Sequence, residues 1–136
     1  MLKLIMSIIA GVIVAFALVF AVDYIVHSIS PTGPAPDPDD REAIRAYVAA
    51  QPEANLAMLV VGWGLAVLGG AALASRLGQR EWAGWVVGGL FLFATAANFL
   101  LIPHPGWMVF GSIASIMAGG WLGSRLGARA GDHQPG

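Results

Sequence analysis

Hydrophobic positions along the chain form long runs that are separated by short clusters of charge. No Asp, Glu, Lys or Arg occurs in residues 4–22, 54–75 or 82–124. A helix needs about 20 apolar residues to cross the ~30 Å hydrocarbon core of a bilayer. The first two runs therefore predict one span each, and the third predicts two. Proline disfavours helical backbone at its own position and at the residue before it, so Pro103-His104-Pro105-Gly106 is the expected turn.

The pattern predicts an all-α membrane protein, an up-down-up-down bundle of four transmembrane helices. The expected spans are residues 4–27, 55–76, 82–102 and 107–125, with residues 28–54 as an outer segment that carries a short amphipathic helix. We expect residues 1–129 to form a single transmembrane domain and residues 130–136 to form a flexible tail. A cleaved signal peptide is the alternative for the first run, but the run is long for such a region.

Composition supports the membrane class. Hydrophobic residues make up 57% of the chain and charged residues only 11%, against about 25% charged residues in soluble domains. The net charge of −1 gives no indication of nucleic-acid binding, and the absence of cysteine excludes disulfides and thiolate metal sites. The expected partners are the lipid bilayer and either another membrane protein or a second copy of the chain.

The positions of Lys and Arg predict the orientation, because these residues are enriched in cytoplasmic loops. One side of the predicted membrane carries Lys3, Arg76, Arg80, Arg125 and Arg129. The opposite side carries only Arg41 and Arg45, which are diluted by acidic residues in the same segment. We therefore expect both termini in the cytoplasm of a bacterium, with the protein in the inner membrane.

The outer segment begins with the proline-rich stretch 31–36, which we expect to be extended. Asp39 followed by Glu42 has the spacing of a capping box and predicts a helix start. Ile44, Tyr47 and Val48 then share one helix face, and Pro52 ends the helix. This amphipathic helix is either a plain helix on the membrane surface or a lid over the bundle.

The second and fourth spans have similar sequences. Gly70, Leu73, Ser75, Arg76, Leu77, Gly78 and Arg80 recur 49 residues later as Gly119, Leu122, Ser124, Arg125, Leu126, Gly127 and Arg129. The first and third spans match more faintly, where 21–25 corresponds to 96–100. Two tandem helical hairpins, the first enlarged by the outer segment, explain both matches. Common residue usage in membrane helices is the alternative.

Small residues recur every four positions in both of these spans, which places them on one helix face. They are Gly62, Ala66, Gly70 and Ala74 in the second span and Gly111, Ser115, Gly119, Gly123 and Gly127 in the fourth. Such stripes let neighbouring backbones approach closely. We expect packing within this bundle, with contact to another protein as the alternative. We also expect that Leu would disrupt Gly119 or Gly123 and be tolerated at Val87.

One polar cluster is a candidate site. Asp23 and His27 share a face near the outer end of the first span, Asn98 lies near the outer end of the third, and His104 is in the turn after it. A carboxylate at membrane depth is costly without a partner, so we expect Asp23 to contact Arg41, Arg45, Asn98 or His104. An ordinary structural role is the expectation.

A divalent-metal or proton-relay site formed by Asp23, His27 and His104 is one alternative role for the cluster. A surface for a ligand or a partner is another. We expect no cofactor, and no catalytic residue is predicted, because no nucleophile and base occur together at a plausible depth. No acid lies at the middle of any span, unlike in small multidrug-resistance exporters.

Several of these motifs together resemble a known family. They are Asp23-Tyr24-Ile25-Val26-His27, the Tyr47 helix ending at Pro52, Gly62-Trp63, Asn98 and Ile102-Pro103-His104-Pro105-Gly106-Trp107. They are similar to a family of small four-helix bacterial membrane proteins with no known activity, over nearly the whole chain. The resemblance implies the four-span fold and no activity.

The functional expectation follows from this pattern. The favoured function is that of a non-enzymatic accessory or assembly component, which acts through its helix faces and outer segment. The alternative is a small dimeric transporter or channel that uses the outer polar cluster. A polar path across the whole membrane would favour the transporter, and the sequence shows polar positions only in the outer third.

Overall fold

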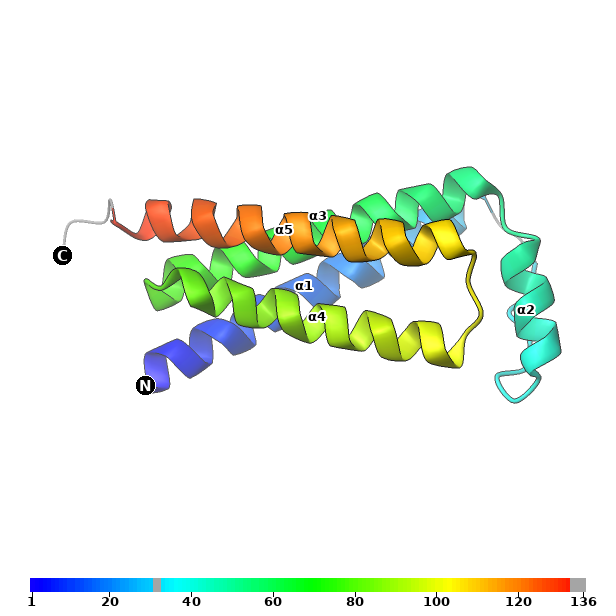
Figure 1. The fold of residues 1–136 in the computed structure, drawn as a ribbon, viewed down its shortest axis with the longest axis horizontal. Helices are drawn as coiled ribbons and strands as arrows, with labels where there is room; N and C mark the ends of the chain where they lie inside the picture. Colours follow the sequence, from blue (N-terminus) through cyan, green and yellow to red (C-terminus); the bar gives the residue numbers. More distant parts are fainter. Residues whose placement is uncertain (31–32, 133–136) are drawn as a thin grey trace.

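The computed structural model describes residues 1–30 and 33–132, and those residues form five helices and no strand. The helices are α1 (Leu2–Ile29), α2 (Arg41–Ala49), α3 (Glu53–Gly78), α4 (Glu81–Leu101) and α5 (Gly106–Asp132). The prediction of an all-helical chain is confirmed, and α1, α3, α4 and α5 are each long and apolar enough to cross a membrane. These four helices pack together, and α2 lies across one end of them (Figure 1).

The helices extend beyond several of the predicted spans. α5 continues through residues 130–132, which were expected to belong to a flexible tail, and the rest of that tail lies outside the described residues. Pro31 and Thr32 of the expected extended stretch also lie outside the described residues. Between α3 and α4 the chain turns at Gln79, whose φ of 54° is left-handed and ends α3.

The start of α2 differs by one residue from the prediction. The N-cap is Asp40, whose side chain accepts hydrogen bonds from the backbone N–H groups of Glu42 and Ala43. Asp39 instead lies in a turn, where its own N–H donates to the Asp37 side chain at 3.0 Å. Because this turn fixes the backbone up to Asp40, the capping box predicted for Asp39 does not form.

α3 is the central helix, since its contacts with α5 and α1 are the most extensive between any two helices. On one face, Gly70 lies so close to Gly11 that a Cβ atom on either residue would meet the carbonyl oxygen of the other. On the opposite face, a Cβ on Gly119 of α5 would meet the carbonyl oxygen of Gly64. The core therefore consists of two seams at which helix backbones nearly touch.

Both predicted stripes of small residues line these seams. In α3, Gly62 faces Val22 of α1, Gly70 and Ala74 lie against Gly11, and Ala66 is buried. The α5 stripe (Gly111, Ser115, Gly119, Gly123 and Gly127) lies against α3, and the Ser115 hydroxyl donates to the carbonyl of Val60 at 2.8 Å. In the structure these stripes are thus occupied by packing within the chain.

The surroundings of Val87 contradict the expectation that leucine would be tolerated at this position. Its side chain is fully buried in the core, and it lies beside the position that a Cβ on Gly11 would take. Leucine there would have to displace packed neighbours, which costs roughly 1–3 kcal/mol in a well-packed core. The expectation was wrong because the sequence of α4 is apolar on every face and does not mark the buried one.

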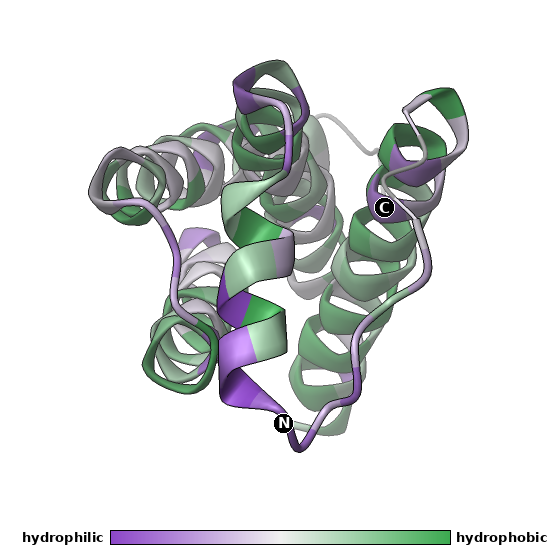
Figure 2. Cartoon of the chain, turned by 90° about the vertical axis from the view of Figure 1, so that its right-hand side faces the viewer, coloured by the Kyte–Doolittle hydropathy of each residue, from purple (hydrophilic) through white to green (hydrophobic). Residues whose placement is uncertain are grey.

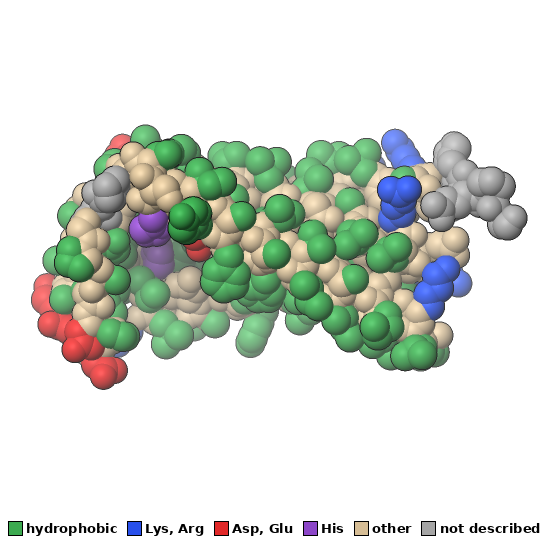
Figure 3. All heavy atoms as spheres, turned by 180° about the vertical axis from the view of Figure 1, so that it is seen from behind, with side chains coloured by type: hydrophobic (Ala, Val, Ile, Leu, Met, Phe, Trp, Pro, Cys, Tyr) green, Lys and Arg blue, Asp and Glu red, His purple; other side chains and the backbone are tan. Residues whose placement is uncertain are grey.

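Charged side chains gather at the two ends of the molecule, and exposed apolar side chains cover the length between them (Figure 3). We call the end that carries both chain termini the terminal end and the opposite end the α2 end (Figure 1). Lys and Arg dominate the terminal end, while Asp and Glu gather beside α2. This distribution is compatible with an integral membrane protein whose apolar helix faces contact lipid.

Candidate functional site

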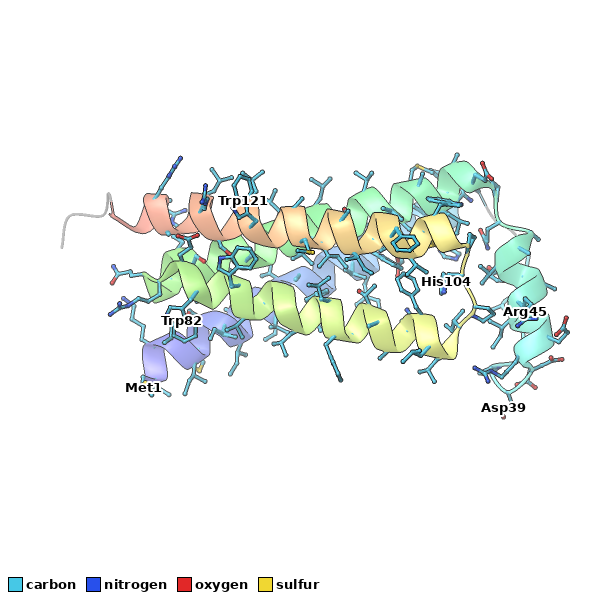
Figure 4. All side chains as sticks on the ribbon, in the orientation of Figure 1. Met1, Asp39, Arg45, Trp82, His104 and Trp121 are labelled. Carbon is cyan, nitrogen blue, oxygen red and sulfur yellow. The ribbon has the colours of Figure 1, made fainter. Side chains whose placement is uncertain are left out.

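A cavity of about 370 Å³ lies at the α2 end, and all four residues of the predicted polar cluster line it. Asp23 and His27 come from the last turns of α1, and Asn98 comes from the last turn of α4. His104 lies in the loop between α4 and α5 (Figure 4). Figure 3 shows histidine side chains in a hollow at this end. We call this space the α2 cavity.

The remaining wall of the α2 cavity is mainly apolar. The amphipathic α2 contributes Ile44, Tyr47 and Val48, the residues that were predicted to share one face. No Cα atom of α2 lies within 8 Å of a Cα atom in another described helix. The helix therefore spans the open end of the bundle (Figure 2) and leaves room for the cavity beneath it.

Asp23 has a partner from another helix, but it is none of the four candidates expected from the sequence. The indole Nε1 of Trp63 in α3 donates a hydrogen bond to the Asp23 carboxylate at 3.3 Å. Gly62, the neighbour of Trp63, lies directly against Val22, the neighbour of Asp23. This close contact between α1 and α3 brings the indole to the carboxylate.

Arg41 was among the candidate partners and binds elsewhere. Its guanidinium donates to the backbone carbonyls of Leu100 and Leu101 at 3.4 and 3.3 Å. These carbonyls belong to the last turn of α4, which has no further helical N–H groups to satisfy them. Arg41 thereby connects α2 to the bundle. Arg45 lies with Arg41 and Glu42 in a separate surface pocket.

The two histidines of the cluster have defined proton positions. Nδ1 of His27 lies 2.7 Å from the carbonyl oxygen of Asp23, and Nδ1 of His104 lies 2.7 Å from the carbonyl oxygen of Ile102. A carbonyl oxygen can only accept, so each Nδ1 carries the proton and donates it. In the neutral rings, each Nε2 is then left with an accepting lone pair.

Asn98 has a buried polar atom without a partner. Its Oδ1 is one of three buried side-chain atoms in the described residues that make no hydrogen bond, the others being Asn55 Nδ2 and Ser112 Oγ. Of these three residues, Asn98 alone lines the α2 cavity. Buried polar atoms normally have partners, so this amide oxygen has unused accepting capacity beside the cavity.

A smaller cavity of about 130 Å³ continues from the α2 cavity into the bundle. Asp23, Trp63 and Asn98 line both spaces. Phe16 of α1 and Phe91 of α4 line its deeper part, and their ring centroids are 4.7 Å apart. From His27 to Phe16, α1 rises about 16 Å at 1.5 Å per residue. The smaller cavity therefore has polar residues where it adjoins the α2 cavity and mainly apolar residues beyond them.

The metal alternative gains no support from this geometry. Within residues 1–30 and 33–132, no three His, Asp or Glu side chains are grouped closely enough to hold a metal ion. Asp23, His27 and His104 line one cavity without forming a ligand set. The arrangement is suited to hydrogen bonding with a molecule in the cavity.

Trp63 is the residue of the site that the sequence prediction missed. A tryptophan inside a span, away from the interface where this residue is enriched, carries an indole N–H that needs an acceptor. Asp23 is the one acidic residue within the predicted spans, which is the signal for such an acceptor, but the sequence does not show that the two side chains face each other. Asp23 and Trp63 meet because α1 and α3 pack closely at Gly62 and Gly70. These contacts fix the position of one helix against the other.

The chain was compared with protein-family models, with curated proteins and with solved structures. No family model matches the chain, no curated protein matches it, and no solved structure matches it. The similarity to small bacterial membrane proteins therefore rests on the sequence motifs alone. Function has to be inferred from the geometry described above.

Proposed function

We propose that this chain is a non-enzymatic accessory or assembly component of the bacterial inner membrane. The four apolar helices support the membrane location. The Lys and Arg side chains at the terminal end support a cytoplasmic position for both termini, with an up-down-up-down path and α2 outside. The location in the inner membrane and the cytoplasmic position of both termini are parts of this proposal.

The observation that carries the accessory role is the placement of α2. This helix stands off the bundle, and Arg41 connects it through two backbone carbonyls. Its cavity-facing side is apolar, and its other side presents Glu42 and Arg45. A helix held this way offers a polar face outside the membrane while the bundle stays fixed. We infer that this face contacts another membrane protein.

Site-specific photo-crosslinking in living bacteria tests this role. A photoreactive amino acid at Arg45 should give a discrete adduct with another protein. The matched control is Phe93, which is 76% exposed on the lipid-covered length of α4 and should give no protein adduct. Absence of a protein adduct from Arg45 and from Glu42 would contradict the proposal, and an adduct with a second copy would identify a homodimer.

The second candidate is a small dimeric transporter or channel, and the continuity of the two cavities favours it. Phe16 and Phe91, whose rings are in contact, line the smaller cavity, so a transport path through it would pass this pair. If the cavities form a transport path, Phe16→Ala with Phe91→Ala should raise cation flux into proteoliposomes several-fold. A double variant as tight as the parent protein would count against transport.

A further inference from the structure

The α2 cavity is rich in hydrogen-bond acceptors. They include the Asp23 carboxylate and the partnerless Oδ1 of Asn98, and the imidazoles of His27 and His104 line the same wall. The indole N–H of Trp63 donates to Asp23, and the side chains of Tyr47, Gln51 and Asn98 on the same wall also carry donor groups. A molecule with donors of its own can bond to the Asp23 carboxylate and to Oδ1 of Asn98.

The charge of the cavity wall indicates which kind of hydrogen-bond donor would bind there. No Lys or Arg is among the described residues that line the α2 cavity, whereas Arg41 and Arg45 line the separate surface pocket. Asp23 is the one Asp, Glu, Lys or Arg among the described residues that line this cavity. An anion would meet this carboxylate without a compensating cation, and a neutral molecule would leave it without a counter-charge. A cation complements the wall.

The shape and the remaining wall define the rest of the molecule. A volume of about 370 Å³ lies within the roughly 300–1,000 Å³ range of small-molecule sites. Apolar side chains such as Ile44, Leu59 and Met108 surround the polar groups. The aromatic faces of Tyr47 and Trp63 also suit an ammonium group, which is attracted to the faces of such rings.

We propose that the α2 cavity binds a primary or secondary amine that carries an apolar body. The ammonium N–H groups bond to Asp23 and to Oδ1 of Asn98, and the body lies against the apolar wall beneath α2. An organic amine fits better than a metal ion, because the described residues provide no grouped ligand set. The proposal depends on neither of the two functions above, since binding is measured on the isolated chain.

Equilibrium dialysis of the full chain in dodecyl maltoside, with radiolabelled 3-phenylpropylamine, tests the proposal. We expect 3-phenylpropanol, which has the same body without the charge, to compete at least tenfold more weakly. The anionic 3-phenylpropionate should not compete. Similar affinity for all three molecules would overturn the proposal, because the charge of Asp23 would then play no part.

Variants assign the binding to this cavity. Asp23→Asn should weaken binding of the amine at least tenfold and remove its advantage over the alcohol. Asp39→Asn is the matched control, because Asp39 is an exposed acid that does not line the cavity, and it should bind as the parent does. Unchanged amine affinity in folded Asp23→Asn protein would overturn the proposal.

A second variant keeps the test valid if Asp23→Asn fails to fold. Ile44→Trp fills the cavity from α2, whose backbone stands apart from the other helices, and should also weaken binding at least tenfold. Full amine affinity in this variant would place the probe elsewhere and contradict the proposal. Added phosphatidylethanolamine distinguishes two sources of the amine. Displacement of the probe identifies the lipid headgroup, and no displacement identifies a free amine.

Discussion

At the scale of single residues, the pair formed by Asp23 and Trp63 determines the character of the site. Asp23 is half-buried near the end of an apolar helix, and the indole of Trp63 donates a hydrogen bond to it at 3.3 Å. Hydrogen bonds to charged groups contribute about 1.5–3 kcal/mol in favourable geometry, and this one is long. The pair therefore stabilises the junction of α1 and α3 modestly.

A double-mutant cycle measures this contribution. Asp23→Asn and Trp63→Phe should each lower the unfolding free energy, and the double variant should lose less than their sum, by about 1 kcal/mol. Reversible unfolding in mixed detergent provides the values. Trp107→Phe, at a ring that is 44% exposed in α5, is the control and should be additive with Asp23→Asn. Strict additivity with Trp63→Phe would mean that the hydrogen bond contributes nothing.

The partner of Asp23 could not have been read from the sequence alone. The sequence marks Asp23 as a costly group and marks the small residues that allow close helix packing, but it does not give the rotation of α1 against α3. That rotation follows from the contact of Gly11 with Gly70. The acceptors of Arg41 could not be predicted either, because no sequence pattern marks the free carbonyls at the end of α4.

At the scale of helices, α2 depends on local interactions more than on packing. Its inward residues are only half-buried, and its N-terminus is capped by Asp40 at 3.1 and 3.0 Å. Loss of an N-cap costs about 1 kcal/mol. That amount is large for a helix of nine residues, since isolated helices of this length are marginal in water.

Hydrogen exchange should therefore be sensitive to this cap. Asp40→Ala should speed exchange of the backbone amides of residues 41–49 about fivefold and leave α3 and α5 unchanged. Asp39→Ala should have a clearly smaller effect, because Asp39 is not the N-cap. A larger effect at Asp39 than at Asp40 would indicate that Asp39 caps the helix, as the sequence predicted.

The seam between α3 and α5 gives a second test at this scale. Gly119→Ala should lower the unfolding free energy by roughly 1–3 kcal/mol, because the new Cβ would meet the carbonyl oxygen of Gly64. Gly89→Ala is the matched control, since a Cβ at Gly89 meets nothing within 4 Å. It should be neutral or stabilising, as alanine favours helix over glycine. Equal effects at both positions would mean that the close contact between α3 and α5 at Gly119 does not stabilise the fold.

At the scale of the whole molecule, the sequence predicted the long helices well because lipid leaves few alternatives. A charge-free run of sufficient length in an apolar chain has to be a helix, since backbone groups in hydrocarbon need internal partners. The ends of the helices and their buried faces were harder to predict from the sequence, because they depend on the turns and on neighbouring helices. The N-cap at Asp40 and the burial of Val87 are the two clearest cases.

Reporter fusions test the orientation. Fusions after Arg129 and within residues 76–81 should report the cytoplasm, and fusions near Asp40 should report the outside. The reason is the excess of Lys and Arg at the terminal end. A cytoplasmic signal near Asp40 would invert the proposed topology and would place the α2 cavity on the inner side.

α5 follows α1, α3 and α4 in the chain, and it is also the helix that α3 contacts most extensively. Until α5 inserts, the backbone of α3 at Gly64 and Leu68 has lipid for a neighbour in place of Gly119 and Gly123. A segment of α1, α3 and α4 without α5 would therefore leave this side of α3 without its close helix contact. A chain cut before Gly106 should consequently be degraded by membrane proteases much faster than the full chain.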